Sequence, residues 1–213
     1  MTPPDTDIRI SPGQRGWTMI EISIVMVLTA VMSLAVFGIL ETSEKGARTV
    51  SSEGEALTQL RRAANLVTQD IKQTTTSRLV IASLPDGNHT VTLQEPLSIT
   101  AGVITWGVKE KELGSTAAAR TKPGWFLRYT VVDAPMPSGP PEKRLVRQAL
   151  DTSMKVQKAW ILARNILPGT STPAGFQLTQ SGSMWKAQIT TRATTGAGIS
   201  APRTLSFDIA LRN

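Results

Sequence analysis

The longest hydrophobic run of the chain extends from Trp17 to Leu40 and contains a single charged residue, Glu21. A helix rises about 1.5 Å per residue, so a run of this length crosses a bilayer hydrocarbon core of roughly 30 Å. A carboxylate inside such a segment is costly unless it is paired or reaches the headgroups. The pattern therefore predicts a membrane-spanning helix over residues 17–40 whose one carboxylate needs a partner or a polar boundary.

Beyond this run the hydrophobic positions follow the period of an amphipathic helix. They recur at intervals of three, four or seven residues, at Val50, Leu57, Leu60, Ala64, Val67 and Ile71. The β-branched residues 74–76 are poor helix formers and predict that the helix ends at Gln73. We therefore expect one helix from Trp17 to Gln73, about 85 Å long if it is unbroken.

After Arg78 the pattern changes to the alternation that is typical of β-strands. Asp86-Gly87-Asn88 is a favourable hairpin turn, and the proline-rich residues 134–141 indicate a surface loop. Further loops are expected over residues 109–122 and 196–202, and a turn of helix over Ala159–Ile166. The predicted strands cover residues 78–84, 90–95, 102–108, 125–133, 145–149, 176–179, 185–191 and 205–211.

One long helix followed by many strands predicts an α+β fold. The amphipathic half of the helix would pack on an antiparallel β-sheet head. We expect four segments: residues 1–16 as a leader, 17–40 as the transmembrane helix, 41–76 as the amphipathic half of the helix, and 77–213 as a β-rich globular head.

Composition and charge narrow the possible functions. The chain has no cysteine, which excludes disulfides, thiolate nucleophiles and cysteine-ligated zinc. The formal net charge is +7, and the excess lies in the last third, where only Glu142, Asp151 and Asp208 are acidic. Such a surface attracts phosphate backbones, anionic lipid or an acidic partner.

No group of residues predicts catalysis. The single histidine, His89, lies beside the expected turn and is interpreted as a solvent-exposed turn residue. Neither a phosphate-binding G-x-x-x-x-G-K-[ST] loop nor a G-x-S-x-G nucleophile motif is present. Tryptophans 106, 125, 160 and 185 lie in apolar runs and are expected in the core. The sequence thus predicts a protein that is not an enzyme and has no catalytic residue, metal or cofactor.

The start of the apolar run carries a specific motif. Gly16 is followed by Trp17, Thr18, Met19 and Ile20 and then by Glu21. This motif resembles the prepilin signature of the type IV pilin superfamily. The resemblance implies that a membrane aspartyl peptidase, the prepilin peptidase, cleaves after Gly16 and methylates the new amino terminus at Trp17.

The leader and Glu21 have physical roles in this interpretation. Arg9 and Arg15 precede the apolar run, so the positive-inside rule keeps residues 1–16 cytoplasmic and exports the remainder. Cleavage would create an α-amino group with a pKa near 8, and the Glu21 carboxylate of a neighbouring subunit could pair with it. Glu21 would then set the register of subunit assembly. Two simpler hypotheses are a single-span anchor with a snorkelling Glu21 and a secretory signal cleaved after Ser33-Leu34-Ala35.

A weaker resemblance covers most of the remaining chain. Short motifs occur in the order found in PilW-like minor pilins and J-type minor pseudopilins of type II secretion: Arg128-Tyr129, Arg144–Arg147, Leu162–Ile166 and Leu211–Asn213. The resemblance implies a pilin-like, non-enzymatic subunit at the tip of a type II secretion pseudopilus or a type IV pilus. Its partners would be other minor and major pilins or pseudopilins, the inner-membrane assembly platform and, before assembly, membrane lipid. It would be a single-pass inner-membrane protein with a periplasmic head.

A second functional class is a membrane-anchored periplasmic binding module. Arg144, Arg147, Lys155 and Lys158 would be its candidate DNA contacts. The basic residues lack interleaved aromatics and a nucleic-acid motif, so the sequence disfavours nucleic acid as a partner. Neutralising these four residues would test this alternative.

Overall fold

The computed structural model describes residues 17–110, 120–137, 141–195 and 198–211. Contacts divide the chain into two compact units, Met1–Gly46 and Ala47–Asn213. The expected leader and its cleavage residue Gly16 lie outside the described residues, as does most of the loop expected over residues 109–122.

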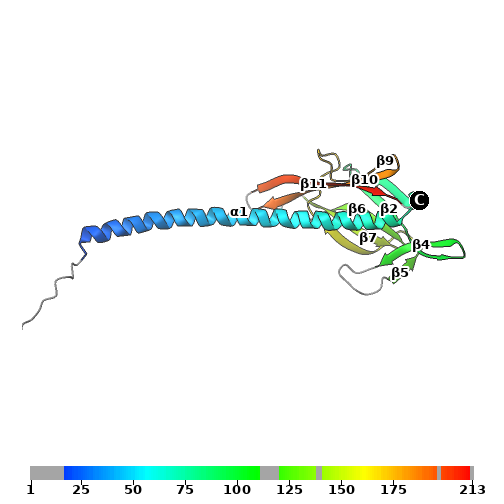
Figure 1. Ribbon diagram of the computed structural model, residues 1–213, viewed down its shortest axis with the longest axis horizontal. Helices are drawn as coiled ribbons and strands as arrows, with labels where there is room; N and C mark the ends of the chain where they lie inside the picture. Colours follow the sequence, from blue (N-terminus) through cyan, green and yellow to red (C-terminus); the bar gives the residue numbers. More distant parts are fainter. Residues whose placement is uncertain (1–16, 111–119, 138–140, 196–197, 212–213) are drawn as a thin grey trace, which may run out of the picture. The chain divides into compact units, whose positions relative to one another are not determined.

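One long helix, α1 (Met19–Gln73), begins the described fold (Figure 1). Its 55 residues confirm the predicted helix and its end at Gln73, with a start two residues after Trp17. In the second unit Leu60, Ala64, Val67 and Ile71 are buried, as their spacing predicted. Val50 and Leu57, by contrast, stay exposed, so the buried face begins only at Leu60.

The head contains three antiparallel sheets, which confirms the α+β class. The largest has the order β1-β2-β6-β7-β8, and the two smaller sheets have the orders β3-β4-β5 and β11-β10-β9. A short 3-10 helix, η1 (Thr76–Arg78), joins α1 to β1. The strands are β1 (Leu79–Ser83), β2 (His89–Leu93), β3 (Glu95–Thr100), β4 (Val103–Glu110), β5 (Arg120–Pro123), β6 (Phe126–Ala134), β7 (Glu142–Leu150), β8 (Val156–Ala163), β9 (Phe176–Ser181), β10 (Met184–Thr195) and β11 (Gly198–Ala210).

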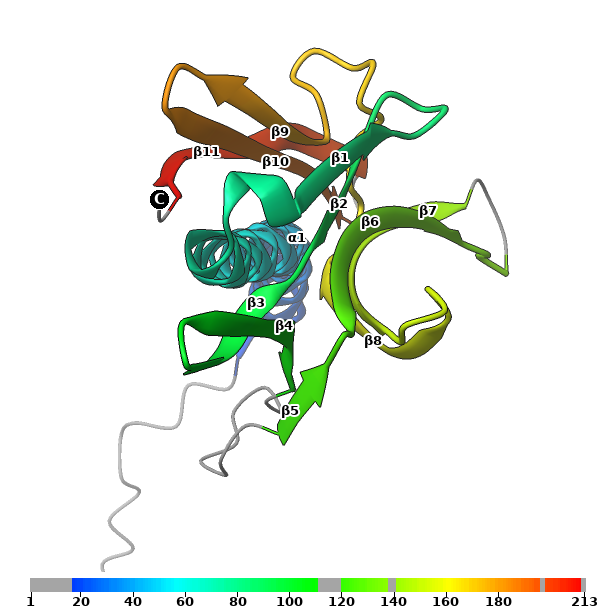
Figure 2. The ribbon, with the colours of Figure 1, turned by 90° about the vertical axis from the view of Figure 1, so that its right-hand side faces the viewer.

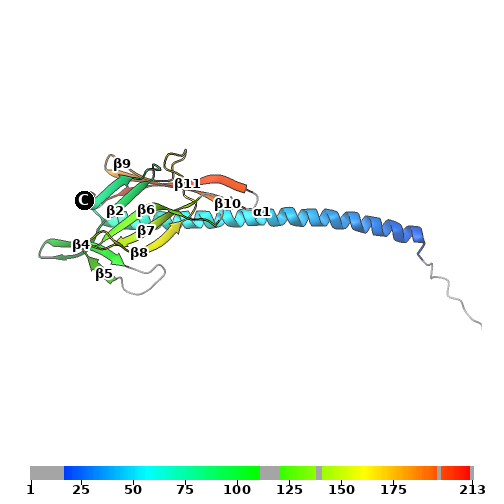
Figure 3. The same ribbon diagram turned by 180° about the vertical axis from the view of Figure 1, so that it is seen from behind.

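The core of the head lies where the second part of α1 meets the sheets. Figure 2, which looks along α1, shows the β9–β11 sheet on one side of the helix, the β3–β4 hairpin on another and β1 and β2 beside it. Figure 3 shows from behind that β6, β7 and β8 lie along the same part of α1. Val67 and Ile71 join a buried cluster with Leu127 and Tyr129 of β6 and Ile189 of β10. The inward face predicted for β6 is therefore confirmed at Leu127, Tyr129 and Val131, although Thr130, expected on the other face, is buried as well.

The structure corrects four expectations about secondary structure. Ala159–Ile166 does not form a turn of helix: most of it is β8, which pairs with β7 from Leu150 to Leu145. A ladder of hydrogen bonds with a neighbouring strand outweighs the ambiguous local pattern. β5 occupies the end of the loop expected over residues 109–122, and β11 includes residues expected in the 196–202 loop. β3 was not predicted because it contains Pro96, which is tolerated in this edge strand beside a register shift.

Candidate functional site

The most unusual surface of the chain is the apolar part of α1. Its large hydrophobic side chains are exposed from Trp17 (69%) and Met19 (88%) to Leu40 (62%). α1 is long and apolar enough to cross a membrane, and none of its most apolar window is buried. An apolar surface of this extent is compatible with a single-pass membrane anchor. We name residues 17–40 the stem.

Glu21 has a local role that our sequence analysis missed. Its Oε2 accepts hydrogen bonds from the backbone N–H of Thr18 (2.8 Å) and the Thr18 hydroxyl (3.1 Å). In return, the Glu21 backbone N–H donates to Thr18 Oγ1 (3.3 Å). This reciprocal arrangement is a capping box, and the T-x-x-E spacing before the apolar run was its signal. Both side-chain bonds use Oε2, so the capping leaves the second carboxylate oxygen, Oε1, for another partner.

A buried polar group joins the second part of α1 to the large sheet. Asp70 Oδ2 accepts hydrogen bonds from the Tyr129 hydroxyl and from Arg147 Nε, the latter at 2.8 Å. The Asp70 and Arg147 side chains are each only 7% exposed. Burial and the Asp70 charge raise the pKa of Tyr129, and Asp70 also raises the pKa of Arg147 against the effect of burial. The group is an ion pair that connects the helix to β6 and β7.

Glu95, at the start of β3, is the titratable group most affected by this arrangement. It is 2% exposed, and its Oε2 accepts a hydrogen bond from the Lys109 backbone N–H at 3.2 Å. Burial and the nearby charge of Asp70 raise the pKa of Glu95 to about 7, although Lys109 and Arg147 oppose the shift. Glu95 can therefore gain or lose a proton near neutral pH.

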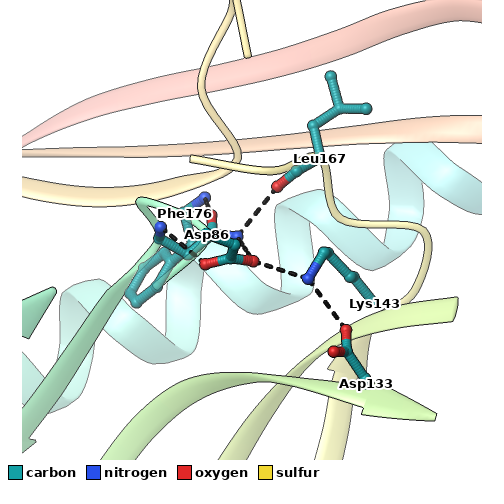
Figure 4. A network of polar contacts seen from close by, with 6 residues as sticks. Asp86, Asp133, Lys143, Leu167 and Phe176 are labelled. Carbon is teal, nitrogen blue, oxygen red and sulfur yellow. Dashed lines mark hydrogen bonds and ion pairs between the residues drawn. The ribbon is translucent and has the colours of Figure 1, made fainter. Parts of the chain in front are cut away.

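A second polar network fixes the β1–β2 turn against the rest of the head (Figure 4). Lys143 Nζ lies 2.8 Å from Asp86 Oδ2 and 2.9 Å from Asp133 Oδ1. Burial would raise the pKa of Asp86, but the hydrogen bonds from Lys143 and Asn88 together hold it below its usual value. The Asn88 side chain also donates to the Leu167 carbonyl and accepts from the Phe176 N–H.

Two glycines in this network have structural reasons: Gly87 because of its backbone angle and Gly169 because two backbones come close together. Gly87 has φ +80°, which favours glycine in the turn. A Cβ at Gly169 would lie 1.9 Å from the Gly87 carbonyl carbon. The turn and the loop before β9 therefore pack backbone against backbone and join the large sheet to the β9–β11 sheet.

The expected role of His89 is wrong. His89 opens β2 and is half-buried, and its Nδ1 accepts a hydrogen bond from the Leu178 N–H at 3.1 Å. The imidazole thus links the first residue of β2 to β9. Within the described ranges, no group of three or more His, Cys, Asp or Glu side chains could hold a metal ion.

The four basic residues of the DNA hypothesis do not form one exposed surface. Arg147 is 6% exposed and bound to Asp70. Arg144 forms an ion pair with Glu142, at 2.5 Å between Arg144 Nη2 and Glu142 Oε2. Lys155 is exposed in the turn before β8, and the Lys158 ammonium lies over the Trp160 ring.

The tryptophans divide into two groups. Trp185 is in the hydrophobic core and Trp125 packs against it, as expected. Trp106 and Trp160 are half-buried outside that cluster, where they lie below the Arg78 and Arg147 guanidinium groups. Their faces therefore contact cations of the same chain.

Comparison with known proteins gives no relative: no family model, no curated protein and no solved structure matches the chain.

Proposed function

We propose that the chain is a non-enzymatic filament subunit, a minor pilin or pseudopilin. The observation that carries the proposal is the exposed apolar stem with Glu21 at its amino end. In this proposal prepilin peptidase cleaves after Gly16 and methylates the amino group of Trp17. The mature subunit then joins the tip of a type II secretion pseudopilus or a type IV pilus.

The apolar surface of the stem supports this proposal because lipid and other stems can each cover it. Before assembly, lipid of the inner membrane covers it, with the head in the periplasm. During assembly, stems of other minor and major pilins or pseudopilins replace the lipid, with the inner-membrane assembly platform guiding the exchange. Between helices in lipid, close packing and polar contacts drive association. A stem with one carboxylate offers both.

The capping box adds a reason for the position of Glu21. Oε2 holds the first turn of α1 by accepting from Thr18. A carboxylate can accept about four hydrogen bonds, so Oε1 is available to the amino group of Trp17 on a neighbouring subunit. The cap fixes the Glu21 side chain beforehand, which reduces the conformational entropy lost when the subunits pair.

The experiment is to purify the protein from its own membranes and to determine its amino terminus by mass spectrometry. We expect a chain that begins at N-methylated Trp17. An intact Met1 would contradict the proposal and support a simple anchor, and a start near Val36 would support a secretory signal.

Variants in the same experiment separate capping from subunit pairing. Glu21→Gln keeps an oxygen acceptor for the Thr18 N–H but removes the charge. We expect this variant to insert and to be processed, but to be lost from purified filaments. Glu41→Gln is the matched control, because Glu41 is a carboxylate of the same helix that pairs with Lys45. If Glu21→Gln entered filaments as the wild type does, the proposed pairing of Glu21 would be wrong.

A further inference from the structure

A polar cleft of about 230 Å³ lies between the second part of α1 and the sheets of the head. α1 contributes Glu55 and Gln59, and the segment after β8 contributes Arg164. Glu142 of β7 and Arg192 of β10 complete the charged lining. All of these residues belong to the second compact unit. The cleft therefore combines two carboxylates and two guanidinium groups.

The carboxylates of the cleft already have partners. The Glu142 side chain is only 9% exposed, and Arg144 binds its Oε2 through Nε (2.6 Å) and Nη2 (2.5 Å). Glu55 Oε1 accepts a hydrogen bond from Gln59 Nε2 at 3.0 Å. Gln59 Oε1 in turn accepts from the Arg164 backbone N–H at 3.3 Å. Glu142 is thus paired with a cation of the same chain, and Glu55 is bound by the amide of Gln59.

The guanidinium groups differ from the carboxylates in this respect. Arg192 Nε is buried and has no hydrogen-bond partner within the described part of the chain. Its backbone N–H donates to the Asn165 carbonyl at 3.0 Å, which places the arginine at the cleft. Arg164 is exposed at the rim of the cleft. Its guanidinium makes no hydrogen bond or ion pair with any residue that the structure describes. Arg192 as a whole is half-buried, and a buried N–H without an acceptor is rare in folded proteins, which points to a partner outside the described chain.

We propose that this cleft binds the carboxylate of an aspartate or glutamate side chain from a neighbouring filament subunit. Arginine donors match a carboxylate in a two-bond geometry, with Arg192 inside the cleft and Arg164 at its rim. A single negative charge fits better than a phosphate dianion, because the latter would lie beside Glu55 and Glu142. That the carboxylate comes from a neighbouring subunit rests on the proposed filament function. The cleft would orient the heads, whereas Glu21 would align the stems.

The first test uses acetate as the probe and the full chain in mild detergent. Nuclear magnetic resonance of the arginine Nε–H groups would follow a titration with sodium acetate against a matched titration with sodium chloride. We expect the Arg192 resonance to shift and to saturate at roughly millimolar acetate. Arg128 is the internal control, because Gln148 Oε1 already accepts its Nε–H at 2.8 Å. No saturable shift, or an equal shift with chloride, would overturn the proposal.

The second test measures assembly in the native membrane. Arg192→Gln removes the buried donor, and Arg164→Gln removes an exposed one with little risk to folding. We expect both variants to be processed at Gly16 and to show about tenfold lower incorporation into filaments. Arg128→Gln, which does not alter the cleft lining, should assemble normally.

The two proposals fail in different ways. If processing and the effect of Glu21→Gln are as expected but Arg164→Gln and Arg192→Gln assemble normally, the cleft proposal is overturned and the filament proposal stands. If the chain keeps Met1 while acetate saturates the Arg192 shift, the filament function is wrong and only the carboxylate site is supported.

Discussion

In the first part of α1 the large apolar side chains are exposed, for example 88% at Met19 and 68% at Phe37, whereas Val67 and Ile71 in the second part are fully buried. Both parts are regular helix, so backbone structure does not distinguish them. The second part is amphipathic and buries one face in the head, but the stem is apolar on all faces and its large side chains are exposed among the described residues. The exposed apolar stem is compatible with a single-pass membrane anchor.

The two carboxylates at the ends of α1 differ in the same way. Glu21 binds Thr18, which is three residues away, and can do so in an isolated helix. Asp70 binds partners 59 and 77 residues further along the chain, Tyr129 and Arg147, and does so only in the folded head. In the proposed filament the first carboxylate therefore stays available to other subunits, whereas the second joins α1 to the head of its own chain.

The largest loss in the free energy of unfolding should come from removing the Asp70 carboxylate. Asp70→Ala leaves the Arg147 guanidinium buried without its counterion, which destabilises a protein by about 3–5 kcal/mol. Chemical denaturation of the full chain in mild detergent, followed by tryptophan fluorescence, would measure this loss. Asp133→Ala is the control, because Asp133 is 59% exposed and its ion pair with Lys143 should contribute less than about 1 kcal/mol. Equal losses for the two variants would contradict the role of the buried pair.

A smaller loss of stability should distinguish the buried apolar face in the second part of α1 from the exposed apolar surface of the stem. Ile71→Ala creates a cavity in the core and should lower the free energy of unfolding by about 2–4 kcal/mol. Phe37→Ala removes a large exposed side chain from the stem and should change the stability of the head by less than about 0.5 kcal/mol. The same denaturation assay compares them. A destabilisation by Phe37→Ala as large as that of Ile71→Ala would mean that the stem packs within the subunit.

Strong periodicity made much of this fold predictable. The helical spacing from Leu60 to Ile71 identified the buried face of α1, and the alternation from Leu127 to Val131 identified β6. β3, β5 and β8 were missed because short segments are stabilised mainly by pairing with strands elsewhere in the chain. Sequence patterns contain no information on such partners.

The candidate sites were predictable to different degrees. Thr18 and Glu21 are three residues apart, so the capping box was readable from the sequence. The cleft was not, because Gln59 and Arg164 are 105 residues apart and meet only after folding. The basic residues of the last third were counted as one surface, although folding buries Arg147 and pairs Arg144. Charge counts therefore overestimated the basic surface.

The smallest expected change in stability comes from proton binding by Glu95, which lies near Asp70 of α1. Glu95 has a pKa of about 7 in the folded protein against its usual value of 4.5, because it is buried near Asp70. Between these two values the folded state holds a proton that the unfolded state has lost, so the stability of the head falls as the pH rises from about 4.5 to about 7. Above that pH the loss is complete, at about 1–3 kcal/mol. Acidic conditions near pH 5 should thus favour the contact of α1 with the head.

Glu95→Gln should remove this pH dependence, because the amide oxygen still accepts from the Lys109 N–H but carries no charge beside Asp70. The free energy of unfolding of the variant minus that of the wild type should therefore be larger at pH 8 than at pH 5, by about 1–3 kcal/mol. Denaturation at both pH values gives this difference, and the other titrating groups cancel in it. No difference between the two pH values would mean that Glu95 is already ionised at pH 5, with Arg147 and Lys109 outweighing burial and Asp70. Any pH dependence of the wild type would then come from other titrating groups of the head.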